Sequence, residues 1–413
     1  MLYVICYIKN MLDINYIRNN VEAVKKNCTN RNVSVDIDGL LSLDQDRRDF
    51  QQQIDDLRAE RNKKSKGKPT GDDIVHLREV GEKIKQFEEK LEEIVQKYTE
   101  LLLSVPNMTH PNSPVGGEEE YVIVEECGKV PEFDFEPKDH EALMLQNDWI
   151  DFERGAKVAG AKFYFVKNEA VQMNQALIQY GMDIAVQHGY QLLETPDLAR
   201  QDVLDASGFN PRGKEESQIY HIENQDLNLI GTAEITVLGY HANEVLDLSD
   251  GPKRYVALSH CFRTEAGAYG KASKGLYRVH QFTKLEMFVL CTPEESEMLH
   301  QELLEIEKEI CDGLGLAYRV IDIPTGDLGG PAYRKYDLEA YMTMKDGYGE
   351  ITSTSNCTDY QARRMNIKYK HGENTNFVHT LNGTAVVTSR FPIAIVEQFQ
   401  KKDGTIIVPS RLK

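Results

Sequence analysis

Residues 261–288 contain the runs CFRTEAG (261–267) and RVHQFTKLEMF (278–288), joined by a basic loop that contains glycine. Both runs are strand-like, and alternate residues of a strand face opposite sides of a sheet. On the second run, Leu285 and Met287 then form a core face. An antiparallel pair would place on the opposite face Cys261, Arg263, Glu265, Phe282, Lys284 and Glu286. Charged side chains on a covered sheet face need partners, so the pattern predicts a binding floor for an anionic, aromatic ligand such as a nucleoside triphosphate.

The composition of the whole chain is that of a globular protein. It has 413 residues, of which 41% are hydrophobic and 28% are charged, enough for about two or three domains. No apolar run reaches the roughly 20 residues of a membrane-spanning helix, so no membrane contact is expected. Residues 1–10 are apolar but too short for a signal peptide, and Met11 suggests an alternative start. The net charge of −18 argues against broad nucleic-acid affinity.

The seven cysteines are scattered, odd in number and without a Cys-x-x-Cys pair. This pattern predicts a reducing compartment such as the cytoplasm, with no disulfides. Cys261 and Cys357 lie in segments that carry other polar residues, but no His/Cys cluster has the spacing of zinc ligands. A zinc cofactor is therefore not expected.

Residues 40–104 differ from the rest of the chain because apolar residues recur at three- and four-residue spacing in two halves. The first half contains Leu40, Leu43, Arg47, Phe50, Ile54, Leu57 and Arg61, and the second contains Ile74, Leu77, Ile84, Phe87, Leu91, Ile94, Tyr98 and Leu101. The polar break at 66–72 separates the two halves, which therefore predict an antiparallel two-helix coiled coil. Each helix of about 27 residues would span roughly 40 Å. Such a hairpin could serve dimerisation or, through the basic residues of 58–68, RNA binding.

A proline- and glycine-containing linker follows the hairpin at 105–117. We therefore expect an N-terminal helical domain over 1–110, with a short helix at 12–30, and a second domain over 111–413. Within the second domain, 171–196 reads as a long helix followed by a strand that ends at Pro196.

Three further segments carry polar residues. Thr232 and Glu234 would share a strand face if 229–234 were extended, and the carboxylate could hold an amino-acid ammonium. The run 349–364 is rich in Ser, Thr, Asn and Arg, and 381–400 contains an isolated Arg390 before an apolar stretch. A guanidinium binds phosphate oxygens well, so Arg390 is a candidate phosphate ligand.

In order and spacing, these segments resemble the motifs of class II aminoacyl-tRNA synthetases, and most closely the bacterial-type seryl-tRNA synthetase family. Residues 263–286 resemble motif 2, 171–196 resemble motif 1, and 381–400 resemble motif 3. The resemblance covers residues 11–413. It implies an α+β fold whose antiparallel β-sheet catalytic core is flanked by helices, a homodimer built through motif 1, and a coiled-coil arm that grips the variable arm of tRNA(Ser).

The same resemblance implies the site residues. Nucleotide-binding residues would be Arg263, Thr264, Glu265, Val279, Phe282, Glu350, Ile351, Thr352, Ser353 and Arg390, with Arg263 and Arg390 as the catalytic cations. Serine-binding residues would be Thr232, Ala233, Glu234, Glu286 and Thr384. Glu350 and Ser353 would also meet the Mg²⁺ that accompanies ATP, because a hard cation prefers oxygen ligands.

The implied chemistry has two steps. The carboxylate of L-serine attacks the ATP α-phosphorus to give seryl-adenylate and pyrophosphate, and a terminal tRNA hydroxyl then attacks the adenylate carbonyl. Charge builds up on phosphate, so fixed cations should dominate catalysis, and no side-chain base is assigned. A site that hydrogen-bonds the serine hydroxyl would reject alanine by roughly 10⁴-fold.

The chain departs from the family pattern in motif 3, where Ser389 precedes Arg390 and Phe391-Pro392 follow it. Proline is tolerated in a first helical turn, so Pro392 is expected to open a helix. Two alternatives remain: a homologue that loads amino acids onto a carrier protein, and a non-catalytic RNA-binding paralogue. The hairpin disfavours the first, and Arg263, Glu286 and Arg390 disfavour the second. Whether tRNA(Sec) is also a substrate stays open.

Overall fold

The computed structural model describes residues 12–65, 70–209, 218–265, 274–345 and 347–413. It divides into two compact units, residues 1–108 and 109–413. The boundary predicted from the sequence lies two residues later, between 110 and 111. The upstream residues 1–10 and the tip of the predicted hairpin at 66–69 lie outside the described residues.

The first unit is helical. Its helices are α2 (Ile14–Asn19), α3 (Val21–Asn30), α4 (Ile37–Lys64) and α5 (Gly71–Ser104). The single short helix expected at 12–30 is therefore two helices that meet at Asn20, whose backbone leaves the helical region. Asp36 caps α4, and Thr70 with Asp73 forms a capping box at the start of α5, the arrangement that satisfies free N–H groups at a helix start.

Helices α4 and α5 pack together as the predicted hairpin. Their shared core contains Ile54, Val80, Ile84, Leu91 and Val95. Val80 and Val95 were not in the predicted seam, whereas the predicted Ile74 is 46% exposed. Ile74 lies in the first turn of α5, where the helix begins beside the polar break.

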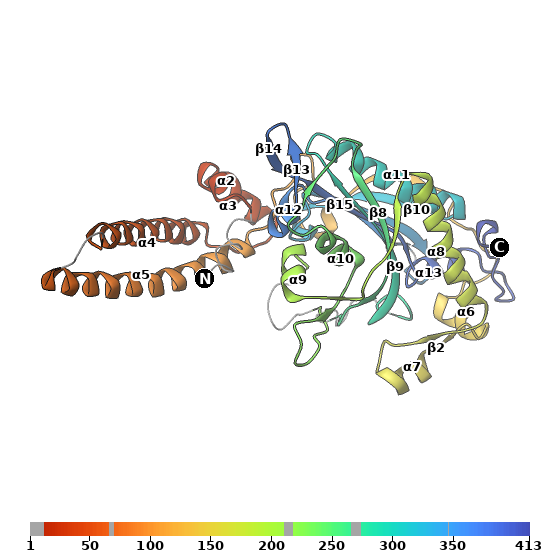
Figure 1. Cartoon of the computed structure of the whole chain (residues 1–413). Helices are drawn as coiled ribbons and strands as arrows, with labels where there is room; N and C mark the ends of the chain where they lie inside the picture. The colour runs from red at the N-terminus through yellow and green to blue at the C-terminus, as the bar shows by residue number, and fades with distance from the viewer. Residues whose placement is uncertain (1–11, 66–69, 210–217, 266–273, 346) are drawn as a thin grey trace. The chain divides into compact units, whose positions relative to one another are not determined.

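The second unit is built on a large sheet, of which β8, β9, β10 and β15 are labelled in Figure 1. Its eight strands have the order β1-β10-β11-β12-β15-β9-β8-β4. In that order, the strands are Val122–Cys127, Tyr318–Asp322, Arg334–Met342, Gly347–Asn356, His379–Val387, Gln281–Cys291, Lys253–Phe262 and Gln191–Glu194. β4 pairs with β8 in parallel, and the other neighbours are antiparallel. The expected antiparallel-dominated core is confirmed.

Helices cover both faces of this sheet. α8 (Glu169–Gln187) packs on β15 and β9, and α11 (Ser296–Leu314) packs on β15 and β12. On the other face, α10 (Ala233–Tyr240) contacts β8 and β9. The remaining helices are α6 (His140–Gln146), α7 (Phe152–Ala159), α9 (Gln201–Ser207), α12 (Tyr360–Met365) and α13 (Phe391–Gln398). α10 packs on this face over Tyr255, Ala257 and Phe288. The floor predicted from 261–288 lies on the same face, further toward the end of β8.

Short elements complete the second unit. The minor strands pair as β2 (Ile150–Asp151) with β3 (Phe165–Val166), β5 (Leu198–Ala199) with β6 (Asn228–Leu229), and β7 (Val245–Leu246) and β14 (Asn374–Phe377) on either side of β13 (Lys368–His371). Single 3₁₀ turns lie at Glu118–Glu120, Thr325–Asp327, Thr343–Lys345 and Ser410–Leu412. In the described parts of the chain, no helix is both long and apolar enough to cross a membrane.

Candidate active site

The pairing of β8 with β9 gives the face assignment predicted from the sequence. Val256 lies opposite Met287 and Leu258 opposite Leu285, which makes one apolar face. On the other face, Ser259 lies opposite Lys284 and Cys261 opposite Phe282. β8 ends at Phe262, but Arg263 continues the pairing because its N–H donates to the His280 carbonyl at 3.0 Å.

A cleft opens over this polar face, and we call it the floor cleft. It is lined by Arg263, Glu265, Tyr277, Arg278, Val279, Phe282, Lys284, Glu350, Ile351, Thr352, Ser353, Thr384, Val387, Ser389 and Arg390. Every predicted nucleotide-binding residue except Thr264 lines it. The N–H of Thr264 instead donates to the Gln218 carbonyl at 3.1 Å.

Two one-residue β-bulges determine which residues reach the floor cleft. In β12, Thr352 lies opposite Leu338 and Glu350 lies opposite Glu339, so Ile351 is an extra residue. Residues three apart in a regular strand face opposite sides. The bulge therefore places Glu350 and Ser353 on the same side of the sheet.

The second bulge lies in β15. Thr384 pairs with Glu286 and Val386 pairs with Leu285, so Ala385 is the extra residue. This bulge places both Thr384 and Val387 on the floor, beside Glu286 and Lys284. The sequence alone does not reveal either bulge.

Arg263 lies against aromatic rings. Its guanidinium carbon is 5.3 Å from the centre of the Phe282 ring and 5.7 Å from that of Phe209. Its Nη2 donates weakly to the Gly231 carbonyl at 3.3 Å. Glu265 has a left-handed backbone (φ 52°), and its carboxylate pairs with Arg278 at 3.1 Å. Arg278 was not among the predicted site residues, although it lies next to Val279.

Arg390 occupies the N-cap position of α13, and Pro392 lies in the first turn of that helix. The expectation that Pro392 opens a helix is thus confirmed. The Nη1 of Arg390 donates to the Glu350 carbonyl at 2.8 Å. Its guanidinium carbon lies 3.8 Å from the centre of the Tyr277 ring, a cation–π contact. The sequence predicts no role for Tyr277, because a single tyrosine beside a loop has no distinctive pattern.

The charge state of Glu350 depends on a small buried network. Burial acts to raise the pKa of Glu350, but the cations Lys335 and Arg390 outweigh it and hold the pKa below its ordinary value. Neighbouring Asp337 behaves oppositely, since burial raises its pKa to about 7 even though Lys335 lies 3.0 Å away. Glu350 is therefore the more fully ionised carboxylate of the pair at neutral pH.

The other end of the floor carries the predicted serine-binding residues. The extended conformation considered for 229–234 is wrong beyond Gly231, because Ala233 begins α10 and Thr232 is its N-cap. The Thr232 hydroxyl accepts the N–H of Glu234 at 3.3 Å, as an N-cap residue does. A Thr-x-Glu sequence fits a helix start as well as a strand, which is why periodicity misplaced it.

Glu234 is buried among hydrogen-bond donors. Its Oε1 accepts from Gln361 at 2.6 Å and from Asn382 at 3.0 Å. Burial, followed by the nearby Glu286, raises the pKa of Glu234 to about 7. Gln361 and Asn382 lie inside the segments that the sequence analysis singled out, but no role was assigned to them.

Glu286 connects the two ends of the floor. Its Oε2 lies 2.5 Å from Lys284 Nζ and accepts from the Thr384 hydroxyl at 3.2 Å. All three side chains are at least nine-tenths buried. The site thus combines two carboxylates, a hydroxyl and a lysine within one desolvated corner.

The described residues include no group of three or more His, Cys, Asp or Glu side chains placed to hold a metal ion. In the same parts of the chain, the six cysteines form no disulfide. Glu350 and Ser353 supply two oxygen donors on one face, which suits Mg²⁺ when phosphate completes the ligand set.

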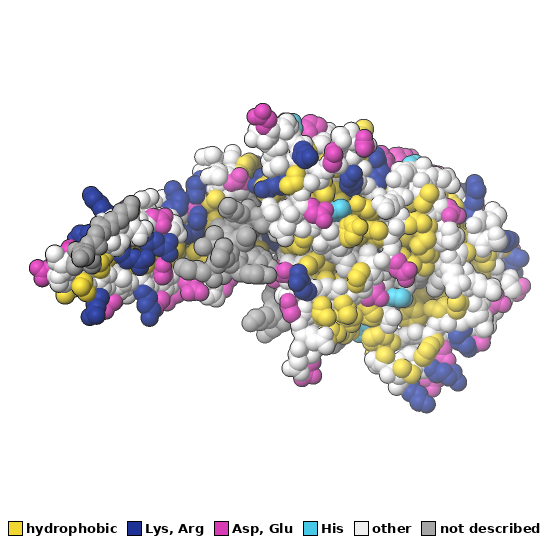
Figure 2. Space-filling view, viewed as in Figure 1, with side chains coloured by type: hydrophobic (Ala, Val, Ile, Leu, Met, Phe, Trp, Pro, Cys, Tyr) yellow, Lys and Arg dark blue, Asp and Glu magenta, His cyan; other side chains and the backbone are white. Residues whose placement is uncertain are grey.

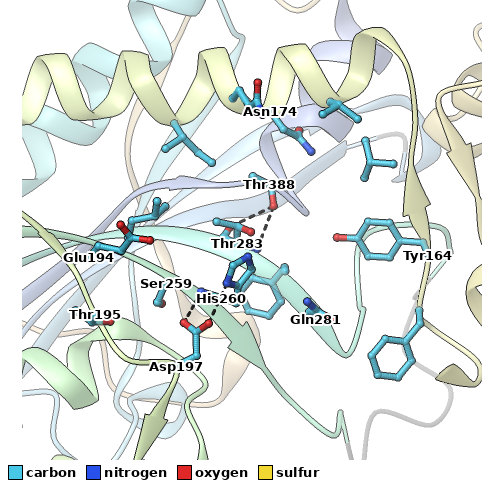
Figure 3. Close-up of a pocket in the computed structure, with 17 residues that line it drawn as sticks. Tyr164, Asn174, Glu194, Thr195, Asp197, Ser259, His260, Gln281, Thr283 and Thr388 are labelled. Carbon is cyan, nitrogen blue, oxygen red and sulfur yellow. Dashed lines mark hydrogen bonds and ion pairs between the residues drawn. The ribbon is translucent and has the colours of Figure 1, made fainter. Parts of the chain in front are cut away.

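A second, larger cavity of about 560 Å³ lies beside α8, β4 and β8 (Figure 3). At its base, Asp197 pairs with His260 at 2.9 Å, and Thr388 bonds to Thr283. Around it, hydrophobic side chains gather on the surface of the second unit (Figure 2). The large exposed ones on α8, β3, β4 and β5 are Val171, Val186, Phe165, Leu192 and Leu198.

The antiparallel sheet, with two arginines and an ionised glutamate over its floor, defines the catalytic core of a class II aminoacyl-tRNA synthetase. The family model described as "tRNA synthetase class II core domain (G, H, P, S and T)" matches residues 218–399. The model "Seryl-tRNA synthetase N-terminal domain" matches residues 11–109. The chain belongs to the seryl-tRNA synthetase family.

Similar proteins extend this comparison over the full chain. A serine–tRNA ligase of Treponema denticola is 51% identical, covering 97% of this chain and 98% of that protein. One of Rubrobacter xylanophilus is 49% identical, with 97% of both chains covered. A solved structure of seryl-tRNA synthetase from Pyrococcus horikoshii complexed with ATP has a TM-score of 0.89, with 38% identity and 97% coverage of both chains.

Proposed function

We propose that the residues of the floor cleft, together with Thr232, Ala233, Glu234 and Glu286, divide between them the reaction of this family, in which the chain ligates serine to tRNA at the expense of ATP. The observation that carries this assignment is the pair of bulges. They bring Glu350 and Ser353 from β12, and Thr384 from β15, onto the same face as Arg263, Lys284 and Glu286.

On the nucleotide side, Arg263 binds the α-phosphate and Arg390 binds the γ-phosphate. Guanidinium groups in a desolvated cleft stabilise the charge that develops on phosphate during transfer. Phe282 stacks on adenine, and Val279 contacts the nucleotide through its backbone. The remaining nucleotide contacts come from Thr264, Glu265, Ile351 and Thr352. The cation–π contact with Tyr277 holds the guanidinium of Arg390 over the cleft.

Glu350 and Ser353 would hold the Mg²⁺ that accompanies ATP. When bound, the ion neutralises phosphate charge. Lys335 keeps Glu350 ionised and therefore competent as a ligand. Neither residue needs to transfer a proton.

On the serine side, Glu234 binds the ammonium group, and Glu286 with Thr384 binds the hydroxyl. Thr232 and Ala233 contribute the start of α10 beside the ligand. Lys284 and Thr384 both contact Oε2 of Glu286, and a carboxylate has further acceptor sites for the serine hydroxyl. A ligand without a hydroxyl would leave this buried carboxylate poorly satisfied, which disfavours alanine.

We also propose that the α4–α5 hairpin binds tRNA(Ser). Its supporting feature is charge at the end of α4, where the described basic residues are Arg58, Arg61, Lys63 and Lys64. Phosphate contacts of this kind supply affinity that weakens with salt. Charging of tRNA(Sec) would follow if that RNA presents a similar arm.

A homodimer is proposed through α8 and β4. β4 lies at an edge of the large sheet and carries exposed Leu192, next to the cavity of Figure 3. Unpaired edges and clustered exposed apolar side chains mark surfaces that associate.

Because its substrates belong to translation, we place the protein in the cytoplasm.

ATP–pyrophosphate exchange with each of the twenty amino acids, without tRNA, tests the assignment of the site. Exchange with serine alone is expected, since Glu234, Glu286 and Thr384 present groups for an ammonium and a small hydroxyl. Absence of exchange with any amino acid in folded protein with Mg²⁺ would contradict it. Exchange with serine but no transfer to tRNA would point to an enzyme that loads a different carrier.

A further inference from the structure

His140 and Glu397 form a buried pair that lies outside the floor cleft. His140 is the first residue of α6, and Glu397 lies in the last turn of α13. Both side chains are fully buried, and their Nδ1 and Oε1 atoms are 2.8 Å apart. Neither residue is needed by the chemistry assigned above, and a buried ionisable pair that is not used elsewhere calls for an explanation.

The hydrogen bonds of His140 fix its tautomer. Its Nε2 accepts the backbone N–H of Leu276 at 3.1 Å, so this nitrogen carries no proton. The Nδ1 nitrogen therefore donates to Glu397. Glu397 Oε1 also accepts the backbone N–H of His140 at 2.9 Å, and Oε2 accepts from Thr343 at 3.0 Å. Each donor and acceptor of the imidazole is used.

The backbone at 274–276 is adapted to this contact. Gly275 has a left-handed φ of +59°, and a Cβ at this position would lie 2.2 Å from His140 Nε2. A larger residue would collide with the ring, so a glycine is required here. A second link lies beside the first, since Lys274 pairs with Asp139 at 2.5 Å.

These contacts connect His140 to Arg390 by two routes, one through the segment of Tyr277 and one through α13. Leu276, held by His140, precedes Tyr277, whose ring lies 3.8 Å from the Arg390 guanidinium carbon. Arg390 occupies the N-cap position of α13, and the same helix carries Glu397, which bonds to His140. One imidazole thus ties both segments that place the arginine, the one carrying Tyr277 and the helix that follows Arg390.

We propose that His140 is a positioning residue for Arg390. Its bond to Leu276 fixes the position of Tyr277 against the guanidinium, and its bond to Glu397 fixes α13. Both contacts preorganise the arginine over the floor cleft. The proposal rests on the assignment of Arg390 to the ATP γ-phosphate. It predicts an effect of His140 on ATP and not on serine, whose ligands lie on α10, β9 and β15.

The first test is His140→Asn, measured by ATP–pyrophosphate exchange. The Asn amide can still donate to Glu397 but is too short to accept the Leu276 N–H. We expect the KM for ATP to rise by roughly tenfold, the change given by losing about one buried hydrogen bond, while the KM for serine stays within about twofold. An unchanged KM for ATP, or equal rises for both substrates, would overturn the proposal.

Two further variants separate positioning from packing. His140→Gln can place an acceptor where Nε2 lies but loses the bond to Glu397, so it should recover only part of the ATP affinity that His140→Asn loses. His241→Asn is the matched control, because His241 is also buried and pairs with Glu244 at 2.7 Å and with the Tyr255 hydroxyl at 2.9 Å. It should lower Tm without changing the KM for ATP. Equal ATP defects in both Asn variants would mean a general loss of packing.

A measurement on the wild-type protein keeps the proposal testable if the variants do not fold. In ¹⁵N-histidine-labelled protein, His140 should give the signature of a neutral ring protonated at Nδ1. A ring protonated at Nε2 would contradict the bond from Leu276. If the wild-type enzyme shows no serine-dependent exchange, the proposed function fails; if it is active and His140→Asn leaves the KM for ATP unchanged, only the positioning role fails.

Discussion

At the scale of single residues, Glu234 predicts a pH dependence. Its raised pKa of about 7 means that the free enzyme carries a neutral carboxyl there in mild acid, and a neutral group pairs poorly with the serine ammonium. We expect kcat/KM for serine to fall by roughly tenfold per unit as the pH drops below about 7. Exchange kinetics from about pH 5.5 to 8.5 would measure this.

The control for this prediction is Glu234→Gln, whose kcat/KM for serine should be low and nearly independent of pH over the same range. Because Gln361 and Asn382 both donate to Glu234 Oε1, the amide oxygen can keep these two bonds. A wild-type profile that is flat through pH 7 would show that another group titrates with serine binding.

Glu286 gives the second residue-scale prediction. Glu286→Ala removes the acceptor of the Thr384 hydroxyl and the partner of Lys284. We expect serine-dependent exchange to fall by at least roughly 100-fold, as for loss of a charge-assisted buried contact, while the Kd for ATP measured by calorimetry changes by less than about threefold. Wild-type-like dependence on serine in this variant would refute the assignment.

The residues of β8 and β9 that share the floor were predictable from the sequence, because alternate residues of a strand face opposite sides of the sheet. The contacts of Tyr277, Gln361 and Asn382 were not predictable in this way. Each of these makes its contact only after distant segments meet, as when Gln361 of α12 approaches Glu234 of α10. Thr232 was placed on a possible strand because an N-cap leaves no periodic signal.

At the scale of elements, α11 supports both bulged strands from behind the sheet. Its Glu307 is fully buried, and Oε2 accepts from the Thr352 hydroxyl at 2.9 Å, next to the bulge at Ile351. Among the described residues, none makes a hydrogen bond of ordinary geometry to Oε1, and a Cβ on Gly383 would lie 2.9 Å from it. Burial raises the pKa of Glu307 well above its usual value, which favours the protonated carboxyl.

The raised pKa of Glu307 makes a stability prediction. A carboxyl whose pKa is higher in the folded protein than in the unfolded chain stabilises the fold in acid, and this stabilisation decreases as the pH rises above the unfolded value of 4.5. Glu307→Gln keeps a neutral side chain of the same shape. Its Tm relative to the wild-type should therefore increase between about pH 5 and 8. A difference in Tm that is constant with pH would show that Glu307 is ionised.

At the scale of the whole molecule, every residue assigned to the floor cleft lies in the second unit, residues 109–413. The hairpin has its own core between α4 and α5. Replacing residues 37–104 by a short linker should leave serine-dependent exchange within about threefold. Aminoacylation of tRNA(Ser) should fall by about 100-fold, which corresponds to about 2.8 kcal/mol of lost binding.

Steady-state charging assays compared with exchange assays would measure this difference. A variant with the four basic residues Arg58, Arg61, Lys63 and Lys64 replaced by glutamine keeps the hairpin and is the matched control for charge. Its defect relative to the wild-type should shrink as the salt concentration rises, because salt weakens the phosphate contacts that only the wild-type makes. Equal loss of exchange and charging in the linker variant would mean that the hairpin is required by the catalytic unit itself.

The two-unit organisation was readable from the sequence because a heptad-like repeat, a Pro/Gly linker and an alternating β pattern follow one another along the chain. The order of the strands was not, since β9 lies between β8 and β15 although about 90 residues separate β9 from β15 in sequence. Such long-range pairings have no local signal in a single chain.

The bulges at Ile351 and Ala385 also affect how distant relatives of this enzyme should be compared. Each bulge changes the parity of its strand, so the residues before and after it follow different odd–even rules. If an alignment places a one-residue gap on the wrong side of either position, it will equate a residue that faces ligand with one that faces the helices behind the sheet. Redesign of substrate choice by exchanging segments between relatives should therefore cut the chain outside these positions.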